Sequence, residues 1–185
     1  GAGVDVSPDG PWKASAMVGR LQKAVAYDRK NPKILPAYER MGYGSKIGYE
    51  KPGYKVEVST FYANDDHTSL GYKPDSLAVF PQQNLAVCYI VQFRPMKGLD
   101  LNMEYGNSAL TLDDRDTTTA RSDGNYLKSL MGTNGGTIVY RAVKVGMNYT
   151  FLKSTLGLGY ERVDPGYRTF GAYYFNNDFE NVTFN

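Results

Sequence analysis

The sequence predicts an all-β fold with antiparallel, up-and-down strands, and three observations support this class. Tyr, Phe and Trp make up 14% of the 185 residues and Gly contributes 20, a composition typical of strands and tight turns. Apolar and polar residues alternate with a period of two through most of the chain, as they do in strands with two unlike faces. Short turns and long polar stretches also alternate as connections between the predicted strands.

Composition excludes several other classes of protein. Lys and Arg number 21 against 19 for Asp and Glu, and this net charge of +2 gives no electrostatic basis for binding nucleic acid. The single Cys and single His exclude a disulfide framework, a thiolate metal cluster and a multi-histidine metal site. No apolar run reaches the roughly 18 residues of a transmembrane helix.

The predicted strands begin at the first residues of the chain. Residues 1–6 are the lower half of a strand that enters a short turn, and residues 40–50 show the clearest alternation. The same period recurs at 54–62, in a hairpin of 85–94 with 99–106, and in a hairpin of 143–151 with 156–161. A strand between the short turn near 7–10 and the long stretch near 25–37, and a last strand at 179–185, bring the count to about nine.

The connections indicate what kind of β protein this is. Short turns lie near 7–10, 51–53, 95–98 and 152–154, and long polar stretches lie near 25–37, 65–84, 113–136 and 164–178. Residues 167–175 either extend the preceding strand or belong to the last long stretch. Long loops at one end and short turns at the other are typical of a transmembrane β-barrel, with periplasmic turns and external loops. We therefore expect residues 1–185 to be one β-barrel segment in the bacterial outer membrane.

One parity of the strands suits lipid hydrocarbon. Tyr49, Tyr54, Phe93, Tyr149 and Phe151 fall near the short turns and would form an aromatic girdle. The predicted lipid-facing residues are Met41, Tyr43, Ile47, Tyr49, Val56, Val58, Leu85, Val87, Tyr89, Val91, Phe93, Leu101, Met103, Val143, Val145, Met147, Tyr149, Leu156 and Leu158.

The other parity carries glycines and charges and is expected to face the lumen. Glu50 with Lys55, and Arg94 with Asp100, would lie across from each other beside the short turns. The predicted lumen-facing polar residues are Arg40, Lys46, Glu50, Lys55, Glu57, Arg94, Asp100, Glu104, Lys144 and Glu161.

A soluble alternative stays open at this point. Alternation alone does not distinguish the inside from the outside of a sheet, and lipocalin-like barrels turn their apolar residues inward. A water-soluble antiparallel barrel or sandwich that binds a ligand would show the same period.

The ends of the sequence suggest a larger protein. Single-chain bacterial barrels have even strand numbers, and exported barrels begin with a signal peptide. With about nine strand segments, no signal peptide and no terminal aromatic residue, the chain is expected to be an incomplete portion of a larger barrel. Expressed alone, residues 1–185 are not expected to form a closed, heat-modifiable barrel.

The strands resemble those of large outer-membrane β-barrel proteins of the Bacteroidota. The specific part of this resemblance is residues 160–178, YERVDPGYRTFGAYYFNND, which look like a loop of such barrels. The resemblance implies an outer-membrane location, a missing N-terminal portion, and possible association with lipoproteins or other barrels.

No catalytic arrangement is found, and neither an enzyme nor a cofactor is expected. His67 beside Asp65 and Asp66 lacks a metal-ligand spacing, and Asp113, Asp114 and Asp116 lack the glycine and closing glutamate of an EF-hand. Cys88 is expected to be an inert thiol on the lumen parity. The glycine-rich residues 132–136 lack the Lys-Ser/Thr of a phosphate-binding loop, so a flexible loop is expected there.

Short sequence patterns suggest modification of the external loops. Asn148 and Asn181 match the N-glycosylation pattern but fall within predicted strands and are discounted. Asp75-Ser76-Leu77 and Asp116-Thr117-Thr118 resemble the short acceptor pattern for O-glycans on exported Bacteroidota proteins, with Ser76 and Thr117 as acceptors.

Two functions follow from a membrane barrel. The first is a pore or transport conduit lined by the inward charges. The second is an occluded barrel that serves as a subunit of an outer-membrane assembly. Outer-membrane lipid, and in the second case other barrels or lipoproteins, would be the partners.

Overall fold

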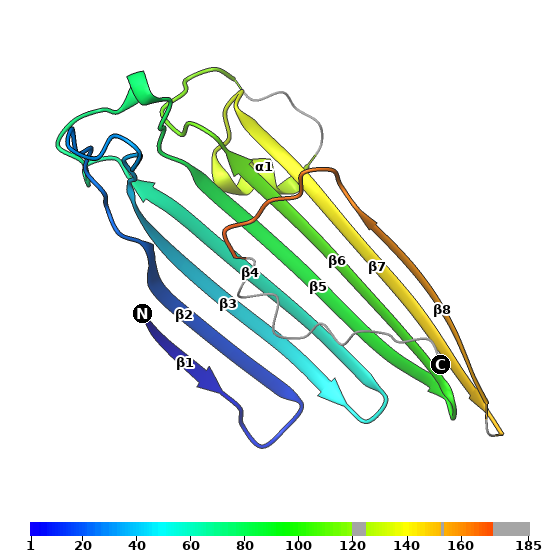
Figure 1. The fold of residues 1–185 in the computed structure, drawn as a ribbon. Coiled ribbons are helices and arrows are strands. Elements are labelled where there is room, and N and C mark those ends of the chain that lie inside the picture. The colour runs from blue at the N-terminus through cyan, green and yellow to red at the C-terminus, as the bar shows by residue number, and fades with distance from the viewer. Residues whose placement is uncertain (120–124, 153, 172–185) are drawn as a thin grey trace.

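The chain forms one antiparallel sheet whose strands follow one another in sequence order (Figure 1). The computed structural model describes residues 1–119, 125–152 and 154–171. The strands are β1 (Ala2–Val6), β2 (Trp12–Gln22), β3 (Glu39–Lys51), β4 (Tyr54–Asp66), β5 (Gln83–Met96), β6 (Leu99–Thr111), β7 (Thr137–Phe151) and β8 (Ser154–Val163).

The predicted all-β, antiparallel, up-and-down class is confirmed. The eight described strands form one sheet in the order β1 to β8, and this sheet is not closed. The expected ninth strand at 179–185 lies outside the described residues. The described part contains no helix long and apolar enough to cross a membrane.

The connections differ strongly in length between the two ends of the sheet. At the end that we call the turn end, residues 7–11, 52–53, 97–98 and 152–153 join the strands. At the opposite loop end, residues 23–38, 67–82 and 112–136 join them. Two-residue turns fix the strand register because they leave no slack between partners.

Two of the short turns depend on glycine. Pro52 precedes Gly53, which takes φ +80°, as the third position of a type II turn requires. Gly98 takes φ +85°, and a Cβ there would clash with the carbonyl oxygen of Thr150. Both turns therefore exclude ordinary side chains.

Alternation gives the sheet two unlike faces. We call the face that carries Lys46, Glu57 and Glu104 the polar face, and the opposite one the apolar face. On the apolar face, successive register partners join one row across seven strands. This row consists of Trp12, Tyr49, Val56, Val91, Met103, Val145 and Tyr160.

Two short helices lie in the long connections. η1 (Asp75–Leu77) is a 3₁₀ turn between β4 and β5, and α1 (Tyr126–Met131) lies between β6 and β7. The side chain of Asn125 caps α1 by accepting from Leu127 N at 2.9 Å, and Gly132 ends it in the left-handed region. Residues 132–136, expected to be a flexible loop, thus contain a helix cap and the buried Asn134.

Helix α1 packs on the apolar face near the loop end. Leu127 and Met131 form a core cluster with Val87 and Ala109, and Val58, Tyr62, Leu85, Tyr89 and Val139 pack around it. Val87, predicted to face lipid, is therefore covered by protein. The sequence pattern could not reveal this because a six-residue helix is too short to produce a recognisable apolar period.

Candidate functional site

The polar face is the candidate functional site because it gathers the charged side chains of several strands. The register and the alternation of side chains place all ten predicted lumen-facing residues on this face and all nineteen predicted lipid-facing residues on the other. Whether these faces meet lumen and lipid stays a prediction at this point.

Ion pairs join neighbouring strands in the turn-end half of the polar face. Glu57 lies 3.2 Å from the Lys46 amine and 3.6 Å from that of Lys55, and its side chain is 10% exposed. A carboxylate this buried needs such partners. The Lys46–Glu57 pair therefore joins β3 to β4, whereas Lys55 supports the same carboxylate from within β4.

The two charge pairs expected from the sequence differ in outcome. Arg94 Nε donates to Asp100 Oδ1 at 2.6 Å, as expected. Glu50 lies directly opposite Lys55 in the register, but its carboxylate accepts from the Lys13 amine on β2 at 2.9 Å. Lys55 instead extends toward Glu57.

Residues 164–171, which we call the strap, continue from β8 and cross the polar face near the loop end (Figure 1). They form no strand in the structure, so residues 167–171 belong to the connection rather than to an extension of β8. The strap and α1 therefore cover opposite faces of the sheet.

Asn84 on β5 is the main anchor of the strap. Its side-chain oxygen accepts from Phe170 N at 2.9 Å and from Thr169 Oγ1 at 3.1 Å. Its amide nitrogen donates to Ser108 Oγ and to the Ala109 carbonyl, both at 2.8 Å. Asn84 is 0% exposed, so each of these bonds is made without competition from water.

Arg40 on β3 provides a second contact to the strap. Its guanidinium donates to both carboxylate oxygens of Asp65, at 2.7 and 2.9 Å. The guanidinium carbon lies 3.6 Å from the centre of the Phe170 ring, which is a cation–π contact. The Asp65 carboxylate also accepts from Gln82 N at 2.9 Å, so this cluster joins β3, β4, the strap and the loop before β5.

Tyr167 closes the strap over Gly106. A Cβ at Gly106 would lie only 3.2 Å from the Tyr167 hydroxyl, so the absence of a side chain there leaves room for the ring. The Tyr167 ring also packs against Tyr140. Burial raises the pKa of Tyr167 to about 12.

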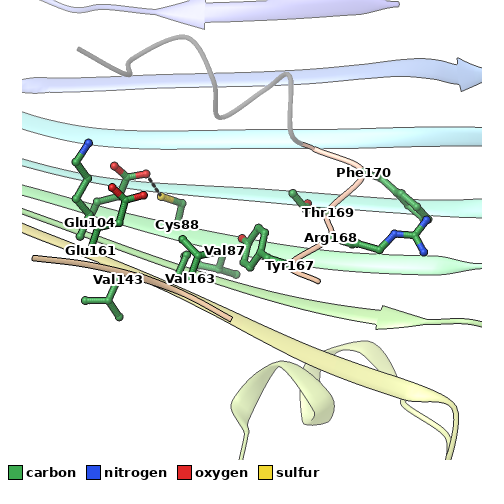
Figure 2. A pocket seen from close by; sticks show the side chains of 13 residues that line it. Val87, Cys88, Glu104, Val143, Glu161, Val163, Tyr167, Arg168, Thr169 and Phe170 are labelled. Atoms are coloured by element: carbon green, nitrogen blue, oxygen red, sulfur yellow. Dashed lines mark hydrogen bonds between the residues drawn. The ribbon is translucent and has the colours of Figure 1, made fainter. Parts of the chain in front are cut away.

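A cavity of about 480 Å³ lies between the strap and β5–β8 (Figure 2). Cys88, Glu104, Lys144 and Glu161 line its sheet side, and Tyr167 lines its strap side. The Cys88 thiol donates to Glu104 Oε1 at 3.9 Å. Glu104, Lys144 and Glu161 occupy one row of register partners, so two carboxylates and one amine face this space together.

Sequence patterns do not predict the strap or its anchors. They place Asn84 in the long polar stretch near 65–84, give no signal at Ser108, and leave Tyr167 and Phe170 open between strand and loop. Gly106 was a usable signal, since a glycine within a strand marks a close approach by another part of the chain.

The acidic residues of the loops pair with basic groups. Arg115 Nε donates to Asp113 Oδ1, and its terminal nitrogen donates to Asp75 Oδ1, each at 3.0 Å. His67 Nε2 lies 2.7 Å from Asp114 Oδ2. Among the described residues no group of three metal-ligating side chains is found.

The two predicted O-glycan acceptors lie on the surface at the loop end. Ser76 is in η1 and Thr117 is in the connection between β6 and β7, and both are exposed. Asn148 lies in β7, as its exclusion as a glycan site assumed. Asn181 lies outside the described residues.

No protein-family model, curated protein or solved structure matches the chain. Its function must therefore be argued from the geometry of the two faces and of the strap.

Proposed function

We propose that the chain is part of an integral outer-membrane β-barrel whose polar face lines a lumen narrowed by the strap. In this proposal the apolar face contacts lipid, and the long connections lie outside the cell. The barrel acts as a conduit, or as the barrel subunit of an outer-membrane assembly with other barrels or lipoproteins.

The observation that carries the proposal is the exposed apolar face of the turn-end half. Ile47 is 56% exposed, Leu158 59% and Tyr160 59%. These side chains belong to register rows that continue across the sheet, so they form one contiguous surface. A soluble protein rarely leaves so extended an apolar surface in water, whereas lipid solvates it.

Aromatic rings support the same reading of this face. Trp12, Tyr49, Tyr54 and Phe93 form a chain of edge-to-face contacts across β2–β5, with centroid separations of 4.9, 6.3 and 6.1 Å. This row lies near the short turns, where an interfacial girdle is expected.

The height of the apolar band also fits a bilayer. On β7 it extends from Phe151 to Val143, about 26 Å along the strand at ~3.3 Å per residue. Strands of such barrels tilt by about 40°, which gives a band ~20 Å tall against the usual ~25 Å. Closure would come from further strands that pair with β1 and β8, because an open edge in hydrocarbon leaves backbone groups without partners.

The soluble alternative has one observation in its favour. Helix α1 packs on the apolar face as a core element would. It lies near the loop end, however, and β5, β6 and β7, with 13–15 residues each, are longer than the 9–11 residues that span a bilayer. In the membrane proposal, the part of the apolar face that α1 covers is the part of the strands that extends beyond the bilayer.

Lipid contact can be tested with fluorophores on single cysteines. The full polypeptide, in a Cys88→Ser background, carries a cysteine at Val145 or at Lys144 and is placed in bilayers that contain brominated lipid. We expect quenching at Val145 and none at Lys144. If neither position is quenched, the apolar face is the core of a soluble protein and the proposal is wrong.

Topology has its own test on intact cells. Cysteines at Ser76 and Thr118 should react with an impermeant reagent, because both positions lie in long connections. Reaction of both positions only after lysis would place the long connections in the periplasm.

The role of the strap can be measured as conductance in planar bilayers. Thr169→Val combined with Phe170→Ala removes strap contacts to Asn84 and Arg40 while leaving the sheet residues intact. We expect larger or more frequent openings than in the control Thr117→Val with Phe80→Ala. Identical records from both variants would mean that the strap does not limit the lumen.

A further inference from the structure

Two arginines interrupt the apolar face near its boundary with the loop end. Arg162 on β8 is the register partner of Val143 on β7, and Arg141 lies two residues beyond Val143 on the same face. Diagonal neighbours of this kind lie about 7–8 Å apart. Both side chains are exposed, so their guanidinium groups can reach one common ligand.

Neither arginine forms an ion pair within the described residues, unlike the other arginines of the described strands. Arg20 pairs with Glu39, Arg40 with Asp65, and Arg94 with Asp100. On the apolar face, β5–β8 contribute no Asp or Glu to which the two arginines could turn.

Asp164 is the nearest carboxylate in sequence, and it has another partner. Its Oδ2 accepts from the backbone N–H of Arg141 at 2.8 Å. Its own N–H donates to the Arg141 carbonyl at 2.9 Å. It therefore ends the β7–β8 ladder with backbone contacts, and the structure records no ion pair from it to either guanidinium.

The position of Arg141 and Arg162 along the strands indicates which part of the membrane would surround them under the proposed function. Toward the turn end the same face continues with Val143, Val145 and Tyr160, the last two being register partners. Arginine side chains at such a position extend their charged ends toward the membrane interface. The pair then lies at the level of the lipid headgroups, directly above the apolar band.

We propose that Arg141 and Arg162 form a binding site for the phosphate group of an anionic membrane lipid; this inference rests on the function proposed above. Two guanidinium groups offer the planar, paired donors that match phosphate oxygens. A lipid phosphate fits better than free phosphate because the apolar band continues directly below the site and solvates acyl chains.

The test measures which lipid is enriched next to the pair. The full polypeptide with Cys88→Ser and a fluorophore on Tyr160→Cys is placed in phosphatidylcholine bilayers. These contain an equal, small fraction of either brominated phosphatidylglycerol or brominated phosphatidylcholine. Each cation near a membrane surface attracts anionic lipid by roughly fivefold, so we expect at least this preference for quenching by phosphatidylglycerol.

Charge removal should abolish the preference only at the proposed site. In the double variant Arg141→Gln with Arg162→Gln, the fluorophore at position 160 should be quenched equally by both brominated lipids. Lys30→Gln with Lys33→Gln, the same charge change on exposed residues of the connection between β2 and β3, should keep the full preference. A preference that survives in the arginine variant, or is lost in the lysine variant, overturns the site.

The remaining outcomes distinguish failure of the lipid-phosphate site from failure of the proposed function. Equal quenching by both lipids in the unsubstituted protein overturns the phosphate site but leaves the lipid-facing assignment intact. No quenching by either lipid refutes the proposed function itself. The preference for phosphatidylglycerol should persist when inorganic phosphate is added. If added phosphate abolished the preference, the site would bind free phosphate, and the proposal of a lipid phosphate would be wrong.

Discussion

The two halves of the same sheet differ in what surrounds them. At the loop end, Phe61, Asn84 and Leu110 are each at most 1% exposed, and α1 and the strap lie on opposite faces. At the turn end, Phe93 is 45% and Leu156 54% exposed. The same alternating strands therefore pass from a protein-like interior into an uncovered surface.

This difference shows that one strand pattern serves two environments. In the loop-end half, stability comes from side-chain packing and buried hydrogen bonds, which the chain supplies itself. In the turn-end half, the apolar side chains need a surrounding apolar phase, which the proposed lipid provides. Substitutions should thus act through different physical terms in the two halves.

The largest expected difference concerns the ion pairs of the two halves. Asp65, 3% exposed, pairs with Arg40 at the loop end, whereas Asp100 and Arg94 are about half exposed at the turn end. Asp65→Ala should cost about 3–5 kcal/mol of unfolding free energy because it leaves a poorly solvated guanidinium. Asp100→Ala should cost about 0–1 kcal/mol. Equal losses in urea unfolding of the reconstituted protein would contradict the distinction.

Helix α1 offers a test of packing at the loop end. Leu127 is 0% exposed in the core cluster, while Leu130 on the same helix is 69% exposed. Leu127→Ala should lower the unfolding free energy by about 3 kcal/mol through lost burial and a cavity. Leu130→Ala should change it by less than about 0.5 kcal/mol. If Leu130→Ala were the more damaging variant, α1 would not pack as described.

A charge on the apolar face tests the turn-end environment. Val145→Arg should cost about 2–4 kcal/mol in a bilayer because the site lies within the proposed hydrocarbon zone. Lys144→Gln, one residue away on the polar face, should cost far less. The folded fraction of the full polypeptide after reconstitution, read as heat-modifiable migration, measures both variants. If Val145→Arg folded as well as the wild type, the apolar face would not contact lipid.

The smallest effect is a pH dependence of the loops. Burial raises the pKa of Asp114 above its ordinary value of 3.8 despite the hydrogen bond with His67. The folded state therefore takes up this proton first, and stability from this group rises as pH falls through its raised pKa. As the pH falls from neutral toward the ordinary Asp pKa of 3.8, the wild type should gain stability relative to Asp114→Asn.

Asp113 provides the opposite sign in the same loop. The side-chain hydrogen bond from Arg115 lowers the pKa of Asp113, so its stabilising contribution is present above the ordinary value and is lost as pH falls through the lowered one. Relative to Asp113→Asn, the wild type should lose stability on acidification. Thermal unfolding midpoints give the two slopes, for Asp114→Asn above the ordinary Asp pKa of 3.8 and for Asp113→Asn below it. Slopes of equal sign would refute the assignment.

The period of two was sufficient to predict the sheet and its faces. It separated the apolar row through Val145 from the charged row through Lys144, because adjacent residues in a strand point to opposite sides. The turn glycines Gly53 and Gly98 marked two hairpins for the same local reason. These features depend on neighbours in sequence, and sequence patterns report such neighbours directly.

The strap, α1 and the Glu50–Lys13 pair were not predictable in the same way. Asn84 and Phe170 are 86 residues apart, and no local pattern indicates that they meet. Lys13 reaches Glu50 because β2 pairs with β3 across a long connection, a partner that alternation within one hairpin cannot supply. Such contacts arise only when distant segments are brought together.

By itself, the sequence determined the strands, their alternating faces and the two kinds of connection, since each depends on the conformation of a few adjacent residues. The tertiary structure alone decided that α1 covers Val87, that the strap crosses the polar face over Gly106, and that Arg141 and Arg162 share one edge of the apolar face. The physical reason is the range of the interactions involved. Backbone geometry and side-chain alternation act over two to four residues, whereas burial, register and ion pairing depend on which distant strands become neighbours.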